Sequence, residues 1–149
     1  MSTFLLMARV TALCLLAYYG TANCLIKAVE TVTFYQPFSR KMADNGVYSL
    51  DDHRHLLMGR WLPMGVLFFV STALSVYLAL RAVPIGPVVG VIALLTGLAV
   101  FGRMTRDPTC AMQRFVVQYR DFMDPEHFQT VLKSDYGMTL EELSGYKRS

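Results

Sequence analysis

Two long stretches without a charged side chain constrain this sequence more than any other feature. Residues 61–80 form a run of 20 uncharged residues, residues 82–102 form a run of 21, and only Arg81 separates them. A helix needs about 20 apolar residues to cross the hydrocarbon core of a bilayer. Because proline and glycine residues follow Arg81, the two runs predict a transmembrane helical hairpin.

The composition of the whole chain agrees with a membrane protein. Hydrophobic residues make up 54% of the 149 positions and charged residues 17%, below the usual quarter of a soluble domain. The formal net charge of +3 is too small to indicate a nucleic-acid partner. The three cysteines are odd in number and show no pairing pattern, so they predict no disulfide framework.

A further apolar run precedes the hairpin. Arg9 and Lys27 bracket 17 uncharged residues, and both side chains are long enough to reach a membrane interface. We therefore expect a first span at about residues 4–30. The alternative is a secretory signal peptide, with Arg9 closing its basic region and residues 20–22 as the cleavage site. We expect a retained span rather than a cleaved signal peptide or mitochondrial presequence.

The connection between the first and second spans is predicted to be a polar loop. The helix is expected to end before Pro37, because the residue that precedes a proline avoids the α region. A polar loop over residues 38–60 follows. Within it, Ser49 and Asp52 have the spacing of a capping box, which predicts a helix start that runs on into the second span.

The fold class that follows is an all-α membrane protein with three transmembrane helices. They are expected at about residues 4–30, 61–80 and 84–102. We predict two domains: a three-helix transmembrane unit over residues 1–103, which includes the polar loop, and a helical extramembrane tail over residues 104–149.

Small residues recur along one side of the third span. They are Gly86, Gly90, Ala93 and Gly97. Such a face allows another helix to approach closely. It predicts packing against a partner subunit, and packing inside this small bundle remains an equal alternative.

The tail is predicted to be helical and amphipathic. Asp107-Pro108 and Asp124-Pro125 each combine a capping residue with proline at the first helical position. An apolar stripe at helical spacing follows the first of these: Met112, Phe115, Val116, Tyr119 and Phe122. Because an isolated helix of this length is marginal in water, the stripe is expected to be buried on lipid or, as we prefer, on a partner subunit.

The basic residues are distributed unevenly about the predicted spans. Three spans place the N-terminus and the hairpin turn on one side, with Arg9 and Arg81 as its basic residues. The other side holds the remaining twelve of the 14 Lys and Arg residues and all 11 acids. Basic residues in short loops stay on the cytoplasmic or matrix side. We therefore expect the 38–60 loop and the C-terminus to face the matrix, or the cytosol in another membrane.

A polar patch near the second span is the strongest candidate for chemistry. On a helix, Asp51 and Asp52 share a face with His55, whereas His53 points elsewhere. That arrangement offers too few ligands on one face for zinc, which needs three or four. We expect no metal, no cofactor and a solvated helix start.

A second hypothesis for this patch is haem or quinone binding. The order of Ser49, His53 and Arg54 resembles the Ser-x-x-His-Arg stretch in the three-span membrane anchors of succinate dehydrogenase, with one extra residue before the histidine. The resemblance covers under a tenth of the chain. It implies a redox anchor with a cofactor near His53, Arg54 and His55.

The function expected from this architecture is a non-catalytic accessory subunit of a larger membrane assembly. No Asp, Glu, Lys, Arg or His lies in the middle of a predicted span, as a proton relay or ion path normally requires. The sequence also has no Gly-rich phosphate loop and no nucleophile elbow, so we expect no enzyme. A mitochondrial inner-membrane respiratory complex or ATP synthase is the preferred assembly. A redox anchor and a small transporter are the alternatives.

Overall fold

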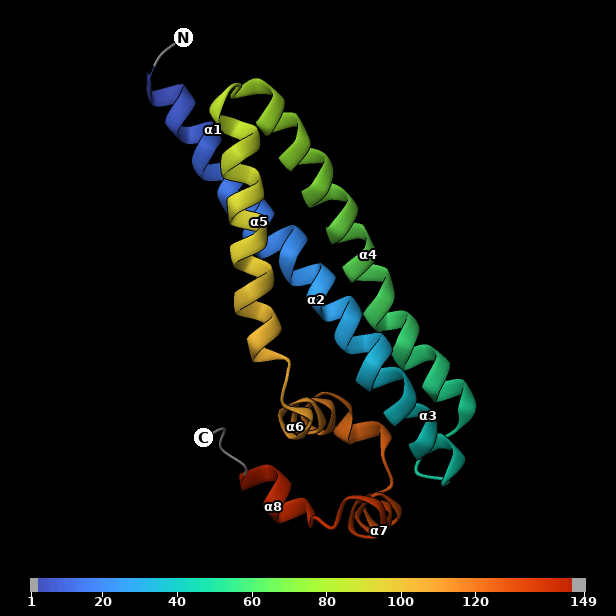
Figure 1. Ribbon diagram of the computed structural model, residues 1–149. Helices are drawn as coiled ribbons and strands as arrows, with labels where there is room; N and C mark the ends of the chain where they lie inside the picture. Colours follow the sequence, from blue (N-terminus) through green and yellow to red (C-terminus); the bar gives the residue numbers. More distant parts are fainter. Residues whose placement is uncertain (1–2, 146–149) are drawn as a thin grey trace. The chain divides into compact units, whose positions relative to one another are not determined.

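The computed structural model describes residues 3–145, and every regular element in that range is helical (Figure 1). Three helical runs are long and apolar enough to cross a membrane: Thr3–Asp44, Leu50–Arg81 and Ile85–Met104. The predicted all-α class with three spans is confirmed. The chain is a multi-pass integral membrane protein.

The first span is one continuous helical run that contains two π-helical segments. Its parts are α1 (Thr3–Leu15), η1 (Leu16–Ala22, π-helical), α2 (Asn23–Glu30), η2 (Thr31–Tyr35, π-helical) and α3 (Gln36–Asp44). The prediction that this helix ends before Pro37 is wrong. The amide of Gln36 donates to the carbonyl of Thr31, five residues back. This wider turn places Pro37 at the start of α3, where a missing N–H and a fixed φ are tolerated.

The second and third spans form the predicted hairpin. Helix α4 (Leu50–Arg81) begins with a capping box, in which the Asp52 amide donates to Ser49 Oγ at 3.1 Å and the Ser49 amide donates to the Asp52 carboxylate at 3.3 Å. Helix α5 (Ile85–Met104) has 20 residues, about 30 Å at 1.5 Å per residue, which matches the hydrocarbon core. Only residues 45–49 lack helical structure between α3 and α4, so most of the predicted 38–60 loop is helix.

The tail folds into short helices whose ends follow the sequence signals. They are α6 (Pro108–Tyr119), the 3-10 turn η3 (Arg120–Phe122), α7 (Pro125–Tyr136) and α8 (Leu140–Gly145). Asp107 accepts the amide of Thr109 at 2.9 Å, and Asp124 accepts the amide of Glu126 at 3.0 Å. Both predicted caps are confirmed. Gly137 ends α7 with φ of 64°, a left-handed conformation that suits glycine.

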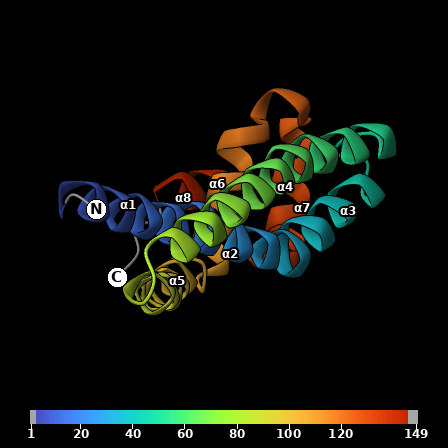
Figure 2. The same ribbon diagram turned by 90° about the horizontal axis from the view of Figure 1, so that it is seen from above.

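The chain divides into two compact units. The membrane unit comprises Met1–Val29 and Trp61–Met104, and the second unit comprises Glu30–Arg60 and Thr105–Ser149. The segment 30–60 thus packs with the tail rather than with the spans. Within the second unit, α3 and the first turns of α4 are the arms of a hairpin (Figures 1 and 2).

Candidate functional site

The small-residue face of α5 packs against the first helix of the same chain. A Cβ atom added at Gly97 would lie 2.7 Å from the Cβ of Ala22 and 3.1 Å from the carbonyl oxygen of Tyr18. At Gly90 the nearest neighbour is the side chain of Leu13, at 3.5 Å. The helix that covers this face therefore belongs to the bundle itself.

The other two residues of the predicted face differ in their surroundings. Gly86 is buried in the hairpin, where an added Cβ would lie 2.6 Å from the carbonyl oxygen of Ala79. Ala93 is half-buried on the same helix. Gly86 thus allows the close turn between α4 and α5.

Three hydroxyl groups of the spans lie close to one another inside the membrane unit. Thr21 Oγ1 lies 3.4 Å from Ser71 Oγ and 3.4 Å from Thr72 Oγ1. Gly20 lies against the Ser71 side chain, so close that any added Cβ would collide with it. This contact joins η1 to α4 where the two helices cross, and polar contacts of this kind stabilise helix pairs in lipid.

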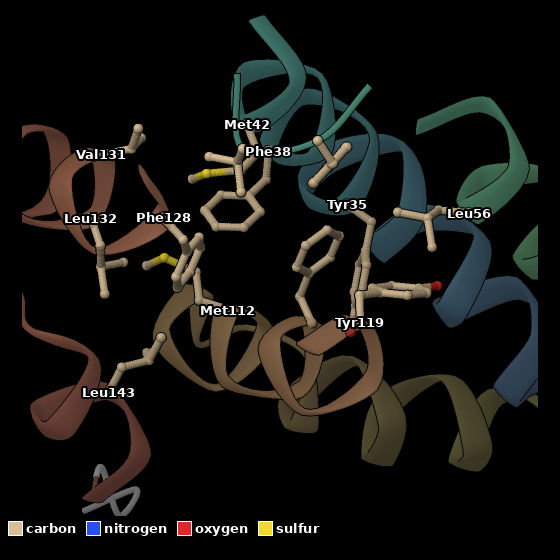
Figure 3. Packing of buried hydrophobic residues seen from close by; sticks show 13 residues of the cluster. Tyr35, Phe38, Met42, Leu56, Met112, Tyr119, Phe128, Val131, Leu132 and Leu143 are labelled. Atoms are coloured by element: carbon tan, nitrogen blue, oxygen red, sulfur yellow. The ribbon is translucent and has the colours of Figure 1, made fainter. Parts of the chain in front are cut away.

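The apolar stripe of the tail is buried by this chain's own residues. Met112, Phe115 and Tyr119 are each less than a tenth exposed. Phe115 packs against Tyr35 and Phe38, with ring centroids 5.6 Å and 5.1 Å apart. Figure 3 shows side chains from α3, α6 and α7 pointing toward one another in this core. These three positions are buried as the spacing indicates, and the side chains that cover them come from the 30–60 segment and from α7 and α8 of the same chain.

Two members of the stripe lie outside that core. Val116 is half-buried at its edge, and Phe122 is 57% exposed because it falls in η3, beyond the end of α6. Packing of these two residues on a partner stays a prediction.

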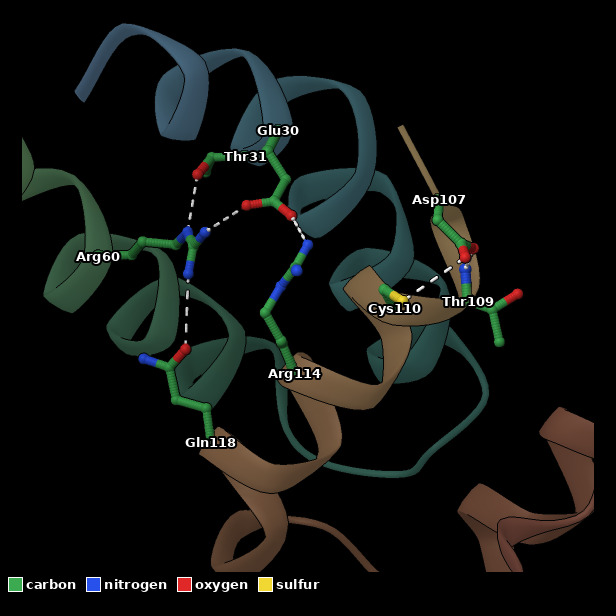
Figure 4. A network of polar contacts seen from close by, with 8 residues as sticks. All are labelled: Glu30, Thr31, Arg60, Asp107, Thr109, Cys110, Arg114 and Gln118. Carbon is green, nitrogen blue, oxygen red and sulfur yellow. Dashed lines mark hydrogen bonds and ion pairs between the residues drawn. The ribbon is translucent and has the colours of Figure 1, made fainter. Parts of the chain in front are cut away.

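The most strongly charged buried site of the second unit centres on Glu30 (Figure 4). Its side chain is 6% exposed and forms ion pairs with Arg60, at 3.2 Å, and with Arg114. Glu30 comes from the end of α2, Arg60 from α4 and Arg114 from α6. One carboxylate therefore ties together three helical segments that are far apart in the sequence.

Arg60 is held from several directions. Its Nε donates to Thr31 Oγ1 at 2.7 Å, and its guanidinium carbon lies 3.7 Å from the centroid of the Tyr35 ring. Gln118 accepts from Nη1 at 3.5 Å. A planar guanidinium can satisfy a carboxylate, a hydroxyl and an aromatic face at once, which lysine cannot. The side chain is only 14% exposed, so the geometry fixes it as a structural group.

No pattern in the sequence predicts this network. Glu30 is separated by 30 residues from Arg60 and by 84 from Arg114, so no local spacing connects them. One signal was present. Glu30 is the first acid in the sequence and follows directly after an apolar span, where an unpaired carboxylate is costly.

A second buried polar cluster joins α3 to the start of α4. Ser39 Oγ lies 2.6 Å from the Tyr48 hydroxyl and 2.7 Å from His53 Nδ1, and the Tyr48 hydroxyl donates to the Ser39 carbonyl at 2.7 Å. All three side chains are buried. Burial raises the pKa of Tyr48 to about 12, so the phenol keeps its proton for these bonds. The cluster closes the 45–49 turn from inside.

The polar patch predicted near residue 53 does not converge on one point. His53 is buried and bonded to Ser39, whereas His55 is exposed. Arg54 is exposed and lies 3.8 Å from Asp51 in a surface ion pair. Among residues 3–145, no group of three or more His, Cys, Asp or Glu side chains is arranged to hold a metal ion.

Comparison with family models, curated proteins and solved structures finds no match to this chain.

Proposed function

We propose that this chain is a non-catalytic accessory subunit of a larger membrane assembly, with a structural or assembly role. The observation that carries the proposal is the small buried share of the spans. In the most apolar windows of the three spans, 17%, 11% and 11% of the residues are buried within the chain. Most of the span surface therefore needs cover from lipid or from other membrane helices.

The use of polar groups in the second unit supports the same proposal. Glu30 is held by two arginines, and Ser39, His53 and Tyr48 are bonded to one another. These groups stabilise the fold, and all of them except Arg114 are largely withdrawn from solvent. The unit still presents exposed apolar side chains outside the spans, including Val117 and Phe122, which suit contact with another protein.

We further propose the mitochondrial inner membrane as the location, and a respiratory complex or ATP synthase as the assembly. The second unit carries twelve of the 14 basic residues, if Lys27 and Arg103 at the ends of the spans are counted with it. Basic residues near span ends favour the matrix or cytoplasmic side. In sealed mitochondria, protease should then reach the tail only after the inner membrane is opened.

The proposal is tested by extracting the tagged chain from its native membrane in a mild detergent and separating the extract on a native gel. We expect the chain to migrate with other proteins at a mass many times its own 16.8 kDa. A sample treated with a denaturing detergent is the control, in which the chain should run alone. Migration without any other protein after mild extraction contradicts the proposal.

A further inference from the structure

Two arginines lie together at the hairpin end of the membrane unit. Arg9 of α1 and Arg81, the last residue of α4, are 72 positions apart in the sequence, yet Nη1 of Arg9 donates to the backbone carbonyl of Arg81 at 3.5 Å. The guanidinium carbon of Arg81 lies 5.4 Å from the centroid of the Tyr77 ring, one turn back in α4. Figure 1 shows the start of α1 beside the turn between α4 and α5. Two like charges are therefore held at one end of the same unit.

The membrane unit has no acid with which to balance these charges. Its segments, residues 1–29 and 61–104, contain four basic side chains and no Asp or Glu, because all 11 acids of the chain belong to the second unit. The four are Arg9, Lys27, Arg81 and Arg103. The second unit differs, since its two buried arginines share a carboxylate of that unit. An anion that balances the charge at the hairpin end must come from outside the membrane unit.

The two arginines lie near the level where lipid phosphates are expected. Helix α5 is about 30 Å long from Ile85 to Met104, which is the thickness of the hydrocarbon core. Arg81 precedes the first residue of this helix by four positions, so it lies at the edge of that core. Tyr77 beside it agrees with this placement, because tyrosine is enriched at membrane interfaces. The planar fork of an arginine side chain matches the oxygens of a phosphate group.

Exposed apolar side chains flank the two arginines in the sequence. Val83 in the hairpin turn and Ile85 at the start of α5 are each more than half exposed. On α1, the same holds for Phe4 and Met7. Such side chains can contact acyl chains, whereas a phosphate ion dissolved in water gains nothing from them. The combination favours an amphiphile over a soluble anion.

We propose that Arg9 and Arg81 form a binding site for the phosphate of a lipid whose headgroup has a net negative charge. Two guanidinium groups without a carboxylate in their own unit favour such a headgroup over phosphatidylcholine, which carries a choline cation beside its phosphate. One bound anion then holds the start of α1 to the hairpin turn, because it contacts both arginines. The inference requires only that the chain spans a membrane and does not depend on the proposed role in a larger assembly.

The test measures lipid binding to the purified full chain in a neutral detergent by native mass spectrometry. Phosphatidylglycerol or phosphatidylcholine is added in steps, and we expect the first phosphatidylglycerol to bind at least about tenfold more tightly. Arg9→Gln and Arg81→Gln, each alone, should weaken phosphatidylglycerol binding about tenfold, because each removes a charged donor from the phosphate. The matched control is Lys27→Gln with Arg103→Gln. It removes two charges from the same unit and should keep the preference.

A soluble anion distinguishes a lipid site from a simple anion site. Inorganic phosphate at the same concentration should not displace phosphatidylglycerol, because it has no chains to contact the apolar side chains. Circular dichroism verifies that each variant is folded. Equal affinity of the unmodified chain for the two lipids, unchanged binding in either single arginine variant, an equal loss in the control variant, or displacement by inorganic phosphate overturns the proposal.

Discussion

At the scale of single residues, the charge of Glu30 matters more than its size. Glu30→Gln keeps the shape of the side chain but leaves Arg60 and Arg114 without their anion. Removing one partner from a buried ion pair costs about 3–5 kcal/mol. We expect the midpoint of thermal unfolding to be clearly lower. Circular dichroism of the protein in detergent measures this midpoint.

The exposed pair of Asp51 and Arg54 gives the control for this substitution. Asp51→Asn removes the same kind of charge from the surface, where such pairs contribute about 0–1 kcal/mol. The two variants should therefore differ strongly. Equal effects on the unfolding midpoint would show that burial of Glu30 adds nothing to its pairing.

A pH dependence is expected at the contact between α3 and α7. Lys41 Nζ lies 2.8 Å from the Asp135 carboxylate, and this hydrogen bond, together with one from Ser134, lowers the pKa of Asp135. A carboxylate whose pKa falls on folding stabilises the native state above its unfolded pKa, and this stabilisation is lost as the pH falls through the folded pKa. Asp135→Asn should therefore lower the unfolding midpoint at neutral pH.

The effect of Asp135→Asn should shrink when unfolding is measured at successively lower pH, below about 4, where the unfolded carboxyl is protonated. Asp121→Asn removes a carboxylate at another exposed position and is the control for the substitution itself. A difference between the Asp135 variant and the unmodified chain that is constant across this pH range would count against the ion pair.

At the scale of elements, the contact between α5 and η1 depends on the absence of one methyl group. Gly97→Ala brings a Cβ to within 2.7 Å of Ala22 and 3.1 Å of the Tyr18 carbonyl oxygen, so the helices must move apart. Overpacking of this kind costs about 1–3 kcal/mol. Gly65→Ala in α4 meets nothing within 4 Å and should be neutral or stabilising. Resistance to unfolding in detergent compares them, and a more stable Gly97 variant would contradict the close contact.

Local signals predicted the elements well, because the forces that set them act within a few residues. The caps at Asp107, Asp124 and Ser49 were readable from spacing, and so were the uncharged spans. Pro37 is the exception, since the expectation that the helix ends there holds for a regular α-helix and a π-helical segment precedes the proline here. The rule for the residue before a proline takes no account of a change from α-helical to π-helical winding next to it.

The periodicity of apolar residues could not predict which distant segments contact one another. The stripe on α6 required burial, yet its spacing carries no information about which surface covers it. The covering residues, Tyr35 and Phe38, lie more than 70 positions earlier. Replacing Phe115 and Tyr119 by Asp is therefore expected to unfold the second unit, a larger effect than release from a partner.

At the scale of the whole molecule, the three spans make a prediction about accessibility. In a background without the native cysteines, Ser49→Cys should react with an impermeant maleimide on one side of sealed vesicles, and Val83→Cys on the other. Ser49 is exposed and Val83 is 64% exposed, so both are open to the reagent. Reaction of both from the same side would contradict the three-span topology.

The second unit is built from two segments that are far apart in the sequence, so its parts are synthesised at different times. Tyr35 and Phe38 leave the ribosome early, but the core that covers them needs residues as late as Leu143. The transmembrane helices α4 and α5 lie between these parts in the sequence. If one of the two failed to insert, the tail would lie on the wrong side of the membrane. The aromatic side chains would then stay uncovered and open to proteolytic quality control. This core can therefore form only in a chain that has inserted with the right number of membrane crossings.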